Sequence, residues 1–324
     1  MGPWYPQVTA PVCAGLIVIG AIASGGSAGA AVPTRPAYGH PQRAVRTAVH
    51  FTLPSGLAVD ARGEVYVADV TGGGTRIQRV SANGQQLASW NIPWHRPAQN
   101  APPVGLAIDP DGNVWVSDTN NDRIEEYSAT GKSLQQRGGT GTRIGQFRTP
   151  MSLTVDAQRN VYVADTLNNR IQKFRKDGYP LAVWPAHGTG RGLFDFPSGV
   201  VVGRTGNVYV VDLSGPVKKL SPVGRTLAVW HRLGSLPGQF NTPTGVALDR
   251  HGNVYVADSN NHRVQKLTSH GQPLAVWSAP TRPGQYFLPE QIAVAPDGRV
   301  YVTNGAANSV VVFSATGKVL AVWH

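Results

Sequence analysis

One pattern recurs six times along the chain and constrains its fold more than any other feature. An aromatic residue stands between two valines at positions 49, 47, 47, 46 and 46 residues apart. The aromatic residues are Tyr66, Trp115, Tyr162, Tyr209, Tyr255 and Tyr301. A proline precedes each of them by 12 positions, at Pro54, Pro103, Pro150, Pro197, Pro243 and Pro289. A spacing kept this closely indicates a repeated structural unit.

Each repeat contains four short runs of residues that favour strands, with turn residues between them. In the fifth repeat these runs are 246–248, 254–256, 264–267 and 274–277. Side chains alternate along a strand, so Val-Tyr-Val gives each sheet two apolar faces. One four-stranded antiparallel sheet cannot cover both faces, whereas six in a ring cover one another. The sequence therefore predicts an all-β fold, a six-bladed β-propeller of four-stranded antiparallel blades over residues 48–324.

The second half of each repeat carries further fixed positions. An aspartate follows the aromatic residue by three positions in five repeats, and the sixth has Asn304. A glycine follows later, at Gly84, Gly131, Gly178, Gly224, Gly271 and Gly317. A tryptophan stands six residues after this glycine in five repeats, and the second repeat has Arg137 there. We interpret these tryptophans as packing residues of the fourth strand.

The segments 118–124, 165–171 and 258–264 share the motif Asp-x-x-Asn-x-Arg-[Ile/Val]. This motif closely resembles the NHL repeat, and the resemblance covers about residues 50–324. It is specific in repeats two, three and five. The first repeat is longer at this point, the fourth is shorter and has Lys218, and the sixth lacks the arginine. The resemblance implies a propeller like those of exported bacterial NHL proteins and of the sensor domain of bacterial receptor Ser/Thr kinases.

The polar residues of this motif allow two interpretations. The aspartate, asparagine and arginine can fix the connection between the second and third strands, because an arginine can bridge backbone carbonyls or a carboxylate. This structural interpretation is the one that we favour. In the alternative, Arg123, Arg170 and Arg263 face a ligand.

The start of the chain has the pattern of a signal peptide. Its first 31 residues contain no Lys, Arg, Asp or Glu, and 12–23 is an apolar run followed by small residues. Ala28-Gly29-Ala30 is an A-x-A-like cleavage site. We expect a signal peptide over 1–30, a Pro-rich linker over 31–47 and a secreted or extracytoplasmic protein without a transmembrane segment in the mature chain. An uncleaved anchor is the alternative.

Residues for catalysis are scarce. The single cysteine, Cys13, lies in the predicted signal peptide, which excludes a thiol nucleophile and the zinc-binding RING domain that some NHL proteins carry. His95, His187 and His231 lie beside fourth strands, far from the axis on which a related lyase gathers histidines. The chain has only four glutamates, too few for a calcium site rich in carboxylates. We therefore predict a non-enzymatic protein without a cofactor; a metal-dependent lyase or hydrolase in the channel is the alternative.

The charge points to anionic partners. The formal net charge is +11, and the predicted signal peptide carries none of it. Some eukaryotic NHL propellers bind single-stranded RNA on a basic face, but export makes a nucleic acid an unlikely partner. The interpretation that we favour is a monomeric binding module for a protein or an anionic cell-envelope ligand.

Loops on a rigid scaffold are the natural place for such contacts. The candidates lie on the connections between blades and on the loops between second and third strands. They are Trp94, Arg148, Met151, Phe196 and Glu290 on the former, and Asp122, Asn169 and His262, beside Arg123, Arg170 and Arg263, on the latter. The closure of the ring is open from sequence, because 48–50 resembles the end of a fourth strand; we expect the last blade to be complete from its own residues.

Overall fold

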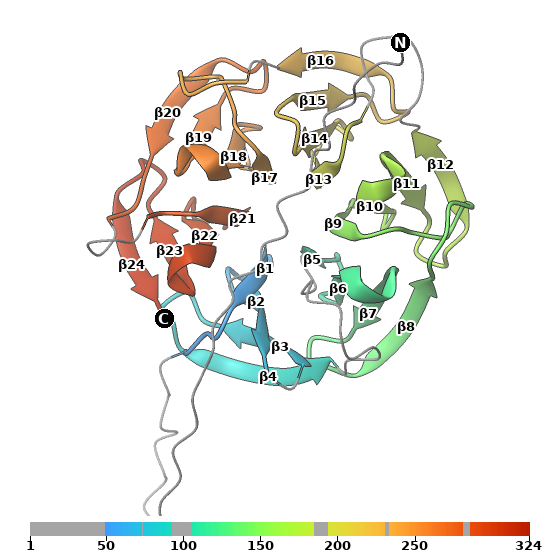
Figure 1. Cartoon of the computed structure of the whole chain (residues 1–324). Coiled ribbons are helices and arrows are strands. Elements are labelled where there is room, and N and C mark those ends of the chain that lie inside the picture. Colours follow the sequence, from blue (N-terminus) through green and yellow to red (C-terminus); the bar gives the residue numbers. More distant parts are fainter. Residues whose placement is uncertain (1–48, 73, 93–104, 185–193, 231–232, 281–285) are drawn as a thin grey trace, which may run out of the picture. The chain divides into compact units, whose positions relative to one another are not determined.

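The computed structural model describes residues 49–72, 74–92, 105–184, 194–230, 233–280 and 286–324. The predicted signal peptide, the predicted linker and Trp94 lie outside these residues. The described strands form six four-stranded antiparallel sheets, each made of consecutive strands, and the sheets stand around a common axis (Figure 1). The prediction of a six-bladed β-propeller is confirmed.

The strands of the first three blades follow the repeats in order. Blade 1 has β1 (Pro54–Val59), β2 (Val65–Thr71), β3 (Gly74–Val80) and β4 (Gln86–Ile92). Blade 2 has β5 (Gly105–Ile108), β6 (Val114–Asp118), η1 (Thr119–Asn121), β7 (Arg123–Tyr127) and β8 (Ser133–Gly138). Blade 3 has β9 (Pro150–Val155), β10 (Val161–Asp165), η2 (Thr166–Asn168), β11 (Arg170–Phe174) and β12 (Pro180–Trp184).

The other three blades repeat this order. Blade 4 has β13 (Pro197–Val202), β14 (Val208–Asp212), β15 (Val217–Leu220) and β16 (Thr226–Trp230). Blade 5 has β17 (Pro243–Leu248), β18 (Val254–Asp258), η3 (Ser259–Asn261), β19 (Arg263–Leu267) and β20 (Pro273–Trp277). Blade 6 has β21 (Pro289–Val294), β22 (Val300–Asn304), η4 (Gly305–Ala307), β23 (Ser309–Phe313) and β24 (Val319–Trp323).

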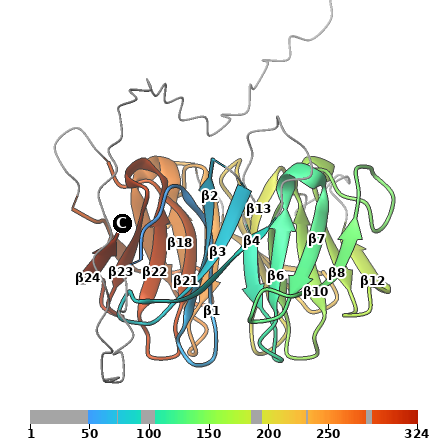
Figure 2. The same cartoon turned by 90° about the horizontal axis from the view of Figure 1, so that it is seen from below.

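The propeller has two different ends, seen from the side in Figure 2. One end carries the turns between first and second strands and between third and fourth strands; we name it the turn end. The other carries the loops between second and third strands and the connections, or returns, from each fourth strand to the next blade; we name it the return end. Among the described residues, no helix is long and apolar enough to cross a membrane.

The core lies between neighbouring blades. Tyr255 of β18 packs with Trp277 of β20 and, across the interface, with Val300 and Val302 of blade 6. The alternation of Val-Tyr-Val thus sends the valines to one interface and the aromatic residue to the other. Each blade therefore covers a face that its neighbour cannot cover alone.

The recurring glycine and tryptophan belong to the same interfaces. The outer-strand tryptophan of one blade lies against the turn glycine of the next, as Trp230 does with Gly271 and Trp277 with Gly317. A Cβ atom at Gly271 would lie 2.4 Å from Nε1 of Trp230. The turn also needs glycine for its backbone, because φ is +83°. Where blade 2 has Arg137 in place of the tryptophan, this side chain lies against Gly178.

The last blade is complete from its own residues, as expected. Strand β24 pairs with β23, and among the described residues no segment of the first blade joins this sheet. The junction of blades 6 and 1 has no return between its blades, and within this part of the chain it closes through side-chain contacts. Trp323, Val310 and Val312 pack there with Val65 and with Val49, which precedes β1.

Candidate functional site

The motif residues of blade 5 hold the return that precedes their own blade. Arg263 bonds through Nε to buried Asp258 at 2.7 Å, and its Nη2 donates to the carbonyls of Leu236 at 3.0 Å and Gln239 at 2.8 Å. Asn261 donates to the carbonyl of Gly234 at 2.8 Å. The arginine therefore bridges a carboxylate and several carbonyls. It stabilises the return before its blade as well as the loop between second and third strands, which is the loop that the sequence predicted.

Blade 3 repeats this arrangement with the preceding return of residues 139–149. Arg170 bonds to Asp165 at 2.6 Å and donates to the carbonyls of Thr142 at 2.7 Å, Arg143 at 2.9 Å and Gln146 at 2.8 Å. The other carboxylate oxygen of Asp165 accepts the amide of Arg148 at 2.7 Å. Arg170 and Arg263 thus direct their donors into the protein.

A glutamine two residues after the arginine completes this set of bonds to the return, which we name the clamp. This glutamine was not among the predicted site residues. Gln172 donates to the carbonyl of Gln146 at 2.7 Å and to Asp165 at 2.9 Å, while its oxygen accepts the amide of Gly145 at 3.0 Å. Gln265 makes the same three kinds of contact in blade 5. The signal was readable, because Arg-[Ile/Val]-Gln occurs at 76–78, 170–172 and 263–265.

Blade 2 has a second acidic residue in place of the glutamine, whereas blade 1 keeps the arginine, the aspartate and the glutamine. In blade 2, Arg123 bonds to Asp118 at 2.8 Å and to Glu125 at 2.6 Å, and Glu125 also accepts the hydroxyl of Tyr127. The return that precedes this blade includes Trp94 and lies outside the described residues. In blade 1, Arg76 bonds to Asp69 at 2.7 Å and to the carbonyl of His50 at 3.1 Å.

Blades 4 and 6 lack the arginine and compensate in different ways. Lys218 takes the glutamine position of blade 4 and pairs with Asp212, both of them buried. Burial raises the pKa of Asp212 to about 6, against the opposing charge of Lys218. Blade 6 has neutral Asn304, whose side-chain oxygen accepts the amide of Leu288 at 2.9 Å. At this motif position a buried aspartate thus occurs where a cation pairs with it, and blade 6, which lacks the cation, has an asparagine.

Asp122, Asn169 and His262 link each loop to the following blade. All three have left-handed backbone, with φ between 52° and 56°. Asp122 accepts the amide of Thr149 at 2.7 Å, and Asn169 accepts that of Phe196 at 2.9 Å. Nδ1 of His262 lies 3.1 Å from the carbonyl of Phe287, and its ring lies 4.8 Å from that of Tyr286. These contacts fix the point where a return enters the next inner strand.

The remaining candidates lie around the start of the inner strands. Arg148 and Phe196 are exposed on returns, whereas Met151 and Glu290 lie within β9 and β21 and are half-buried. Burial raises the pKa of Glu290 to about 7. The carboxyl group of Glu290 lies against Gly305, where a Cβ atom would be 2.3 Å from it. The described candidates therefore come from blades 2 to 6 at the return end, and of these Asn169 and Phe196 are joined by a hydrogen bond.

The most exposed apolar side chains of the clamped returns were not among the candidates. Ile144 is 60% exposed on the return before blade 3, and Leu233 and Leu236 are 73% and 64% exposed on the return before blade 5. The two returns share the sequence Gly-Gln-Phe at 145–147 and 238–240, with Phe147 and Phe240 buried. The shared triplet was visible in the sequence, but exposure is a property of the folded loop.

The described residues contain no group of three or more His, Cys, Asp or Glu side chains that could hold a metal ion.

Comparisons with known proteins agree with this architecture. The NHL repeat family model matches residues 103–127, 147–174 and 240–267, which fall in blades 2, 3 and 5. These are the three repeats in which the motif is specific. No curated protein sequence matches the chain.

Solved structures match over most of the chain. A streptogramin B lyase is 14% identical and covers 86% of this chain and 85% of its own, with a TM-score of 0.60. Virginiamycin B lyase from Staphylococcus aureus is 15% identical and covers 84% of each chain, with a TM-score of 0.59. A chain of a nidogen–laminin complex is 20% identical and covers 81% of this chain and 93% of its own, also with a TM-score of 0.59.

At these identities the likeness is one of fold. The three repeat matches and the strand topology together identify the chain as a six-bladed β-propeller that contains NHL repeats.

Proposed function

We propose that this protein is an exported, non-enzymatic binding module that recognises a protein or an anionic cell-envelope ligand through its return end. The observation that carries the proposal is the contrast within the clamped returns. Their backbones are held by Arg170 and Arg263, while their tips expose Ile144, Leu233 and Leu236. Fixed loops with exposed apolar tips lose little conformational entropy when a partner covers them.

The surroundings of one tip fit an anionic partner. Arg143 and Arg148 are exposed beside Ile144, and no ion pair with a described carboxylate involves either arginine. An apolar anchor next to arginines is a common composition of the centre of a binding surface. The nidogen–laminin complex is named for the association of two proteins, which accords with a propeller in a binding role.

The test is capture of a cell-surface partner by wild-type protein and by the double variant Ile144→Asp/Leu236→Asp. We expect the double variant to lose at least tenfold in affinity for the captured partner, because each aspartate places a charge in the apolar contact. The matched control is Leu134→Asp/Leu320→Asp, which changes exposed leucines of outer strands β8 and β24. Equal loss in both variants would contradict a site at the return end.

Two further measurements test the other parts of the proposal. Elemental analysis of protein purified without a chelator should show no stoichiometric metal; bound zinc or calcium would favour the alternative of a metal-dependent lyase or hydrolase. Export predicts that protein recovered from outside the producing cell begins near residue 31. A recovered chain that begins at Met1 would instead indicate an uncleaved anchor.

A further inference from the structure

One part of the turn end exposes cationic side chains with few carboxylates beside them. It consists of four turns of blades 4 and 5, at 203–207, 221–225, 249–253 and 268–272. We name these four turns the basic sector. They expose Arg204, Arg225 and Arg250, and the only acidic residue in their sequences is Asp249.

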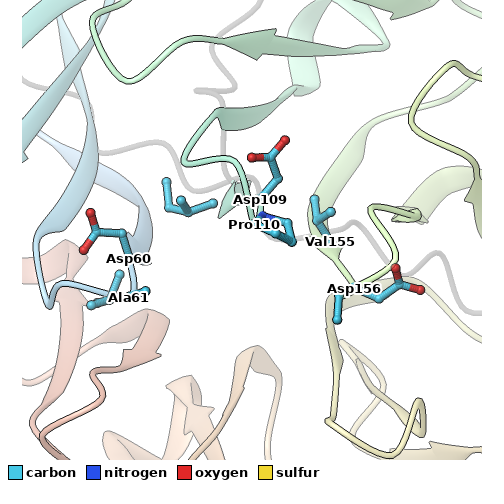
Figure 3. A pocket seen from close by; sticks show the side chains of 9 residues that line it. Asp60, Ala61, Asp109, Pro110, Val155 and Asp156 are labelled. Atoms are coloured by element: carbon cyan, nitrogen blue, oxygen red, sulfur yellow. The ribbon is translucent and has the colours of Figure 1, made fainter.

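Blades 1 to 3 differ from the basic sector at the same end. Their first turns have an aspartate where the first turn of blade 4 has Gly203. These aspartates line a cavity of about 210 Å³, and they are Asp60, Asp109 and Asp156 (Figure 3). Nζ of Lys176 lies 3.1 Å from Asp109 and 3.0 Å from Asp111. The carboxylates of blades 1 to 3 thus offset cations that lie beside them.

The turns of the basic sector lie side by side across the junction of blades 4 and 5. A Cβ atom at Gly203 would lie 3.2 Å from Leu248, which ends the inner strand before the first turn of blade 5. Nζ of Lys219, in the third strand of blade 4, donates to the carbonyl of Ser269 in the second turn of blade 5 at 2.9 Å. The three arginines therefore belong to neighbouring turns of one surface.

An apolar tip stands among these cations. Val223, in the second turn of blade 4, is 82% exposed, more than any other large apolar side chain of the described residues. Pro222 before it is also exposed, and Arg225 follows two positions later. A Cβ atom at Gly206 would lie 3.0 Å from Pro222, so the turn that carries Arg204 lies beside this tip.

The charges of the basic sector have little compensation from nearby carboxylates. None of its three arginines forms a salt bridge with a carboxylate of the described residues. Nε of Arg250 donates instead to Nε2 of His251 at 3.1 Å. Asp249 accepts the amides of His251 and Asn253, both at 2.9 Å, so this carboxylate faces its own turn. An anionic surface that approaches the basic sector would relieve the repulsion among its cations.

We propose that the basic sector docks on an anionic lipid bilayer, with Val223 and Pro222 among the headgroups and the three arginines toward the lipid phosphates. At a membrane interface an apolar side chain leaves water while cations meet anionic headgroups. A soluble polyanion has no apolar phase for Val223, so the apolar tip favours a bilayer. The turn end lies opposite the return end, and the proposal is independent of any partner bound there.

The experiment is sedimentation of the whole protein with vesicles of phosphatidylcholine, alone or mixed with phosphatidylglycerol. Wild type should bind the anionic vesicles, and this binding should weaken as the salt concentration rises. Each arginine near an anionic bilayer contributes about fivefold to the partition coefficient, so Arg204→Ala/Arg225→Ala/Arg250→Ala should lose about a hundredfold. Val223→Ser should lose at least about threefold, because less apolar surface leaves water.

A matched variant separates the basic sector from a general effect of charge. Arg62→Ala/Lys132→Ala/Arg175→Ala removes the same charge from exposed turns of blades 1 to 3 and should lose less than about fivefold. An equal loss in both triple variants, or no sedimentation with anionic vesicles, would overturn the proposal. A partition coefficient that Val223→Ser leaves unchanged would indicate attraction by charge alone, as to a soluble polyanion, and would overturn the assignment to a bilayer. Vesicle binding by Ile144→Asp/Leu236→Asp should match wild type, so failure here and failure of the proposed function are distinguishable.

Discussion

At the scale of single residues, the arginine of the NHL motif acts as a structural clamp. Arg263→Ala removes an ion pair to fully buried Asp258 and the bonds to the return before blade 5. We expect a loss of about 3 kcal/mol in the free energy of unfolding, because a buried carboxylate is left without its partner. Arg263→Lys should lose less, since it keeps the charge but not the planar set of donors.

Urea unfolding of these variants measures the effect. Arg225→Ala is the control, because Arg225 is exposed on a turn and its loss should change stability by less than about 0.5 kcal/mol. If Arg263→Ala were as stable as Arg225→Ala, the clamp would have no energetic weight, and a ligand-facing role for the arginine would be the better interpretation.

Glu290 gives the stability of the propeller a dependence on pH. Burial raises its pKa from 4.5 to about 7, so the folded state binds a proton more tightly than the unfolded state between these values. The free energy of unfolding should therefore fall as pH rises from about 4.5 to 7 and then level off. Glu290→Gln removes this decline, and the difference from wild type should grow by about 2 kcal/mol between pH 5 and 8.

The comparison of the two proteins isolates Glu290 from other groups. The pKa of Asp212, raised by burial to about 6, contributes a decline of the same sign to wild type and variant alike. Urea unfolding at both pH values provides the measurement. A constant difference between the two proteins would show that the carboxyl group of Glu290 is solvated in the folded state.

At the scale of the strand and its turn, the recurring glycine is explained by its neighbour in the adjacent blade. Gly271→Ala places a Cβ atom against the ring of Trp230 and strains a backbone with φ of +83°. Gly252→Ala meets the same backbone strain, with φ of +81°, but no atom within 4 Å. We expect Gly252→Ala to cost about 1 kcal/mol and Gly271→Ala about 1 to 3 kcal/mol more.

Thermal unfolding of the two variants checks this difference. Equal midpoints would mean that the turn geometry alone requires the glycine and that its contact with the tryptophan is incidental. The paired positions make the comparison direct, because both glycines lie in tight turns of the same blade and at the same end.

The strands and their faces could be predicted from the sequence, because they depend on local alternation and on short turns. The tryptophan positions were assigned to packing, but their glycine partners lie one blade away, about 40 residues along the chain. The reach of Arg170 and Arg263 to a return some 24 to 28 residues earlier was missed for the same reason. A repeat in a single sequence shows which positions are fixed, but it does not show which neighbouring unit they contact.

At the scale of the whole propeller, five of the six blade interfaces are joined by a return of the chain. The sixth, between blades 6 and 1, is held in the described residues by side-chain contacts. Trp323 fills this junction, and Arg299 donates across it to the carbonyl of Ala82 at 2.6 Å. When a contact is lost at the junction without a return, its two blades can separate. At the other junctions the return keeps the two neighbouring blades at high effective concentration.

Trp323→Ala and Trp184→Ala remove the same kind of contact at these two kinds of interface. Each should cost about 3 to 5 kcal/mol in global stability. In Trp323→Ala the ring should also open locally, with a free energy below that of global unfolding. The amides of blades 1 and 6 should therefore exchange with solvent faster than those of blades 3 and 4. In Trp184→Ala the exchange should stay close to the global limit in all blades. If both variants exchanged uniformly, the packing of the sixth junction would be as cooperative as that of the joined ones, and ring closure would not be the weak point of this fold.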